Sequence, residues 1–156
     1  MPHRVFIRVA GRVGTGIKEH FPIRVSEWVM LLPFFGMALV LRLQPDMFTK
    51  SGSFSTLSRW GSEEFWSFLC IVCGSLRLIA LVVNGTFSKV FPYSPHFRML
   101  TALVALVFWS QYSLAILDAY FRTNGALSGV IPYTTFVVFE LVNFWRSNVD
   151  RHLSAK

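Results

Sequence analysis

The chain has 156 residues, of which 53% are hydrophobic and only 15% are charged, against about 25% charged residues in ordinary soluble domains. Sixteen phenylalanines and five tryptophans accompany a formal net charge of +7. This composition excludes an ordinary soluble domain and favours one helical domain that spans a membrane.

A basic leader, residues 1–24, precedes the first apolar run. Arg4, Arg8 and Arg12 recur at every fourth residue, so a helix would align their side chains on one face. This spacing is typical of a short interfacial helix, while the glycines of the leader equally favour a disordered basic segment that adheres to lipid headgroups. In either form, the side chains expected to contact anionic headgroups are those of Arg4, Arg8, Arg12, Lys18 and Arg24.

Four apolar runs are long enough to cross a bilayer as helices. They cover about residues 25–43, 65–83, 99–120 and 127–145. Pro33 predicts a bend in the first span, and the short connections favour antiparallel neighbours. We therefore predict an all-α, integral membrane four-helix bundle over residues 25–146, followed by a basic tail at 147–156.

Lysine and arginine are unevenly distributed between the two sides of this bundle. One side has Arg42, Lys50, Arg59 and Arg122, and the other has Arg4, Arg8, Arg12, Lys18, Arg24, Lys89, Arg98, Arg146, Arg151 and Lys156. Because cytoplasmic flanks are enriched in these residues, we predict that both termini are cytoplasmic. Topology and attraction to anionic lipids explain the positive charge, so nucleic acid is not an expected partner.

The connection between the first two spans, residues 44–62, is rich in serine and threonine. This composition is typical of loops. We predict a mobile external loop on the side opposite both termini.

Cys70 and Cys73 have the C-x-x-C spacing of redox and zinc motifs. They lie inside the second span, however, and they are the only cysteines of the chain. We interpret them as small packing residues, with redox or metal chemistry as the alternative. The sequence therefore predicts no catalytic residue, no cofactor and no metal site.

Arg77 lies near the middle of the second span, where an unpaired guanidinium costs several kcal/mol. At helical spacing, its face of the helix collects small or polar side chains, which let another helix approach closely. This packing stripe consists of Ser67, Cys70, Cys73, Gly74, Ala80 and Asn84.

Glu140 of the fourth span is the expected partner of Arg77. Arg77 lies before Asn84 by seven residues, about 10 Å of helix, and Glu140 precedes Arg146 by six, about 9 Å. The two spans run in the same direction, so we predict an ion pair, to which Asn143 adds a hydrogen bond. The alternative is that Arg77 snorkels to the interface, although its Cα–Cβ bond points the other way.

Two roles remain open for this pair. A buried pair can fix the arrangement of helices at some cost in stability, or an intramembrane carboxylate can belong to a proton or ion path. A single pair without a chain of further carboxylates favours the structural role.

The stretch 74–87, Gly-Ser-Leu-Arg-Leu-Ile-Ala-Leu-Val-Val-Asn-Gly-Thr-Phe, and the residues Ser-Pro-His-Phe-Arg at 94–98 resemble a segment of small, functionally unassigned, multi-spanning membrane proteins of tailed phages and prophages. This resemblance implies location in a bacterial inner membrane. It also implies a holin-like role, in which many copies assemble and permeabilise the membrane.

Two other roles fit the same residues. The chain could be a non-enzymatic structural or accessory subunit that binds other membrane proteins through Ser67, Cys70, Gly74 and its phenylalanine-rich faces. It could instead be a small channel or transporter that uses Arg77 and Glu140. The expected partners are accordingly anionic lipid and either further copies of the chain or other membrane subunits.

Overall fold

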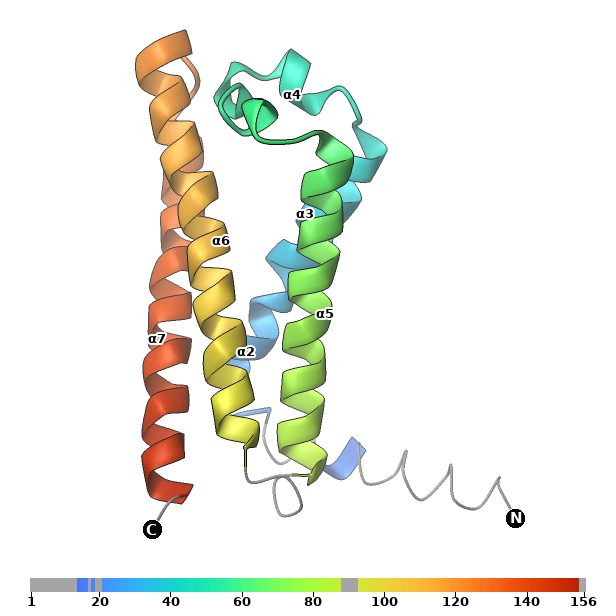
Figure 1. The fold of residues 1–156 in the computed structure, drawn as a ribbon, viewed down its shortest axis with the longest axis vertical. Coiled ribbons are helices and arrows are strands. Elements are labelled where there is room, and N and C mark those ends of the chain that lie inside the picture. The colour runs from blue at the N-terminus through green and yellow to red at the C-terminus, as the bar shows by residue number, and fades with distance from the viewer. Residues whose placement is uncertain (1–13, 17, 19–20, 88–92, 155–156) are drawn as a thin grey trace, which may run out of the picture.

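The computed structural model describes residues 14–16, 18, 21–87 and 93–154 (Figure 1). Throughout these ranges the regular secondary structure is helical. Four helical segments there are long and apolar enough to cross a membrane, namely Val25–Leu43, Glu63–Asn84, Ser94–Thr123 and Leu127–His152. The predicted all-α membrane bundle is confirmed.

The first span is divided at Met30 into α2 (Val25–Val29) and α3 (Leu31–Leu43). Pro33 accounts for this division. It has no N–H to donate to the carbonyl of Val29, four residues earlier, and its ring crowds that carbonyl. The predicted bend is therefore an interruption of one residue.

The other spans are α5 (Glu63–Phe87), α6 (Ser94–Thr123) and α7 (Val130–Ser154). Helix α6 packs along α7, α3 packs along α5, and α5 contacts α6 (Figure 1). We call the end of the bundle where α2 and α6 begin the α2 end, and the opposite end the α4 end. Helix α7 continues through Ser154, so the predicted tail at 147–156 is a continuation of the fourth helix over its described part.

The predicted mobile loop is instead a folded cap over the α4 end (Figure 1). It contains α4 (Met47–Lys50) and two 3₁₀ turns, η1 (Gly52–Phe54) and η2 (Leu57–Arg59). Leu57 is fully buried, and the Thr56 hydroxyl donates to Asp118 Oδ2 of α6 at 2.9 Å. The hydroxyl groups of this segment thus attach it to the helices, although their abundance is typical of a loop.

The interior toward the α4 end is filled by aromatic side chains. Trp109 and Tyr112 of α6 are fully buried, and their rings lie 5.9 and 5.3 Å from that of Tyr133 of α7. Phe34 of α3 completes the contact, with its ring 4.8 Å from Trp109. We call these four residues, together with Trp66, Phe108 and Phe136, the aromatic cluster.

Candidate functional site

Arg77 and Glu140 form a buried ion pair between Nη2 and Oε2. Their side chains are 3% and 0% exposed, respectively. The pair joins α5 to α7 across the interior, whereas each of these helices packs along α6. Arg77 is thus paired with Glu140, the partner expected from the equal depth of the two residues in their spans. Its side chain does not extend to the interface.

Asn143 connects this ion pair to the α2 end. Its Nδ2 lies 3.5 Å from Glu140 Oε2, and its Oδ1 accepts a hydrogen bond of 2.7 Å from the hydroxyl of Ser26 in α2. Arg146 Nη1 lies 3.5 Å from the same hydroxyl. The amide therefore holds the start of the first span against the fourth.

The packing stripe of α5 contacts other helices of the same chain. Ser67 Oγ donates to the carbonyl of Ala38 in α3 at 3.0 Å, and a Cβ added to Gly74 would lie 3.1 Å from Phe34 Cβ. Cys73 is half-buried, and the remaining members of the stripe are buried: Ser67, Cys70, Gly74, Ala80 and Asn84. Ser67 and Gly74 thus face α3, and binding of another protein through Ser67, Cys70 and Gly74 stays a prediction that would require this buried face to open.

A second charged network, not predicted from the sequence, lies at the α2 end. Arg98 of α6 donates from Nε to Glu27 Oε2 at 2.9 Å and from Nη1 to Asp150 Oδ2 at 2.7 Å. Its Nη2 also pairs with Glu27 Oε1. This one guanidinium thus joins α2, α6 and α7. The signal in the sequence is the position of Glu27 and Arg98 near the starts of apolar runs, which is the position of an ordinary flanking charge.

Arg24 belongs to this network and does not have the predicted position among lipid headgroups. Its side chain is 13% exposed, and Nη2 lies 3.5 Å from Asp150 Oδ2. Burial, followed by the nearby positive charge of Arg98, lowers the pKa of Arg24 below its ordinary value. Of the other predicted headgroup contacts, Lys18 is exposed, while Arg4, Arg8 and Arg12 lie outside the described residues.

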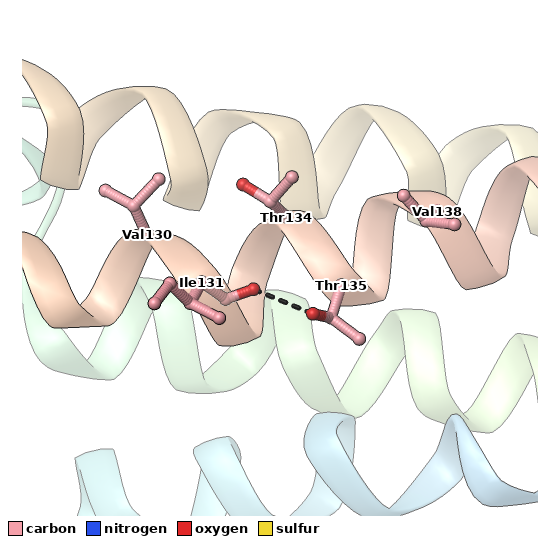
Figure 2. A pocket seen from close by; sticks show the side chains of 5 residues that line it. All are labelled: Val130, Ile131, Thr134, Thr135 and Val138. Carbon is pink, nitrogen blue, oxygen red and sulfur yellow. Dashed lines mark hydrogen bonds between the residues drawn. The ribbon is translucent and has the colours of Figure 1, made fainter.

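The outer face of α7 has a shallow groove near the α4 end, lined by Val130, Ile131, Thr134, Thr135 and Val138 (Figure 2). The Thr135 hydroxyl donates to the carbonyl of Ile131 at 2.9 Å. Thr134 and Ser113 of α6 share a hydrogen bond of 2.8 Å. With its hydroxyls satisfied, this groove presents a neutral, largely apolar surface.

Cys70 and Cys73 are free thiols. Among the described residues, no three His, Cys, Asp or Glu side chains are grouped so that they could hold a metal ion. In the described part of the chain, the ionisable side chains that lie together in the interior are those of the two charged networks.

No protein-family model, curated protein or solved structure matches the chain. The geometry of the charged networks is therefore the basis for inferring what the protein does.

Proposed function

We propose that the chain is a non-enzymatic accessory subunit of a larger complex in a bacterial inner membrane. In this role it is a preformed four-span bundle that binds other membrane proteins through its outer faces. The α2 end lies in the cytoplasm, because ten of the lysines and arginines flank that side and four flank the other.

One observation carries this proposal: the deeply placed charges are paired within a single chain. Arg77 is matched by Glu140, and Arg98 by Glu27 and Asp150. A bundle that neutralises its own charges needs no further copy to become stable in lipid. Its surface is left with large apolar side chains, such as Phe68 of α5, which is 60% exposed, and Phe139 of α7, which is 42% exposed.

The holin-like role has less support from this geometry. Self-assembly into an aqueous pore requires a polar face that neighbouring copies can turn toward water. The Arg77–Glu140 pair is enclosed in each bundle, and the groove on α7 is largely apolar. The role as a channel is also less favoured, because the aromatic cluster fills the interior on the α4 side of the pair.

Expression of the full chain alone, and in cells of its natural source, tests the proposal. Expressed alone, the protein should leave growth and membrane potential unchanged. From its natural source, it should co-purify with a stoichiometric membrane protein. Phe68→Ala and Phe139→Ala each remove an exposed apolar side chain, from α5 and from α7, and loss of the partner in either variant identifies the helix that binds it.

Growth arrest with depolarisation on expression alone would support the holin-like role and contradict the proposal. Ion flux that Glu140→Gln abolishes in a bundle that remains folded would support the channel. Recovery of the natural protein without any stoichiometric partner would also contradict an accessory subunit.

A further inference from the structure

The buried charged and amide side chains of the described chain extend from the Arg77–Glu140 pair toward the α2 end. Each is at most 4% exposed, and they are Glu27, Arg77, Asn84, Arg98, Glu140 and Asn143. On the other side of the pair, Phe136 is one turn from Glu140 along α7 and belongs to the aromatic cluster. The buried charged and amide side chains therefore lie on one side of Glu140 and the aromatic cluster on the other.

The ion pair does not satisfy its own hydrogen-bonding groups. Arg77 Nε, Arg77 Nη1 and Glu140 Oε1 are buried and have no hydrogen-bond partner among the described residues. Arg24 Nε and Trp109 Nε1 share this property, and of these two the neutral Trp109 group carries the smaller cost. Buried polar groups of this kind are commonly satisfied by water.

A polar route connects the ion pair, at Glu140 Oε2, to the surface at the α2 end. From Glu140 it passes Asn143 and the Ser26 hydroxyl to Arg146, which is half-buried. Beside it lies Asp150, whose side chain is 39% exposed. Polar side chains that can bind water therefore extend from the aqueous phase at the α2 end to the ion pair.

We propose that Glu140 is a proton-binding site that exchanges with the aqueous phase at the α2 end alone. A hydronium ion transfers its proton to Glu140 Oε1 and leaves as water. Arg77 keeps its charge and continues to donate from Nη2 to Oε2, which becomes the carbonyl oxygen of a neutral acid. This site goes beyond the accessory role proposed above, and either can fail without the other.

Charged groups from α2, α5, α6 and α7 surround Glu140. Arg77 of α5 contacts it directly, and the Cys73 thiol of the same helix lies near both charges. Glu27 of α2 is held by Arg98 of α6, and Arg146 and Asp150 lie further along α7. Arg24, before α2, pairs with Asp150. Of the two buried carboxylates, Glu140 has an oxygen without a hydrogen-bond partner among the described residues, whereas Arg98 binds both oxygens of Glu27.

Infrared spectroscopy of the full chain tests the site in vesicles that contain it in one orientation. A step to acidic pH on the α2 side should produce a carboxylic-acid C=O band, and exchange of H₂O for D₂O should shift this band. The Glu140→Gln variant should lose the band. The control is Glu64→Gln, which removes an exposed carboxylate outside the charged networks and should retain the band.

The Glu140→Asp variant keeps a carboxylate and should move the band rather than remove it, which covers the case in which Glu140→Gln does not fold. The proposal is overturned if the band is absent from the wild type at every pH at which helicity is retained. It is also overturned if the band persists in Glu140→Gln, or if an acid step on the α4 side produces it equally well.

Discussion

Arg98 of α6 binds both carboxylate oxygens of Glu27 in α2, in a site where the two side chains are 1% and 6% exposed. The same guanidinium reaches Asp150 of α7 at 2.7 Å. Together with Arg77 and Glu140, which join α5 to α7, this contact ties the helices together through charges that lipid would disfavour. The stability of the bundle should therefore depend on complete pairs more than on any single charged residue.

The two acidic partners of Arg98 should differ in their importance. Glu27→Gln leaves a guanidinium buried without its main partner and should cost about 3–5 kcal/mol of unfolding free energy. Asp150→Asn should cost at most about 1 kcal/mol, because its partly exposed side chain is already screened by water. Unfolding in mixed micelles measures both, and equal losses would contradict the assignment of Glu27 as the buried partner.

Gly74 should be intolerant of a larger side chain. A Cβ there would lie 3.1 Å from Phe34 Cβ and from the ring of Phe35, so Gly74→Ala should force α3 away from α5 and cost about 1–3 kcal/mol. Gly36 is the matched control within α3, because a Cβ there meets no atom within 4 Å. Gly36→Ala should be neutral or stabilise the protein by up to about 1 kcal/mol. A similar loss of unfolding free energy in both variants would refute the close contact between α5 and α3 at Gly74.

The cap over the α4 end should resist proteases in the native protein. Leu57→Ala empties a fully buried position and should cost about 2–5 kcal/mol, with faster cleavage within residues 44–62. Ser58→Ala is the control, since the Ser58 hydroxyl donates to the carbonyl of Ser55 at the surface and has no other hydrogen bond among the described residues. Rapid cleavage of the wild-type segment would show instead that this connection is a mobile loop.

The sequence contained enough information to place Arg77 beside Glu140, because depth in a helix follows from the rise per residue and both spans run the same way. It did not reveal the Arg98–Glu27 pair. Charges at the ends of apolar runs are ordinarily solvated, and the burial of these two depends on how α2 lies against α6 and α7. The cap was missed for a related reason: Thr56 and Asp118 are 62 residues apart, and local composition does not predict such contacts.

A double-mutant cycle on Arg77 and Glu140 tests the central claim most directly. The measured quantity is the unfolding free energy of Arg77→Leu, Glu140→Leu and the double variant in mixed micelles. Each single change leaves one buried charge unpaired and should cost about 3–5 kcal/mol, whereas the double variant should recover most of this loss. Losses that simply add in the double variant would contradict the claim that this bundle is held together by charges paired within one chain.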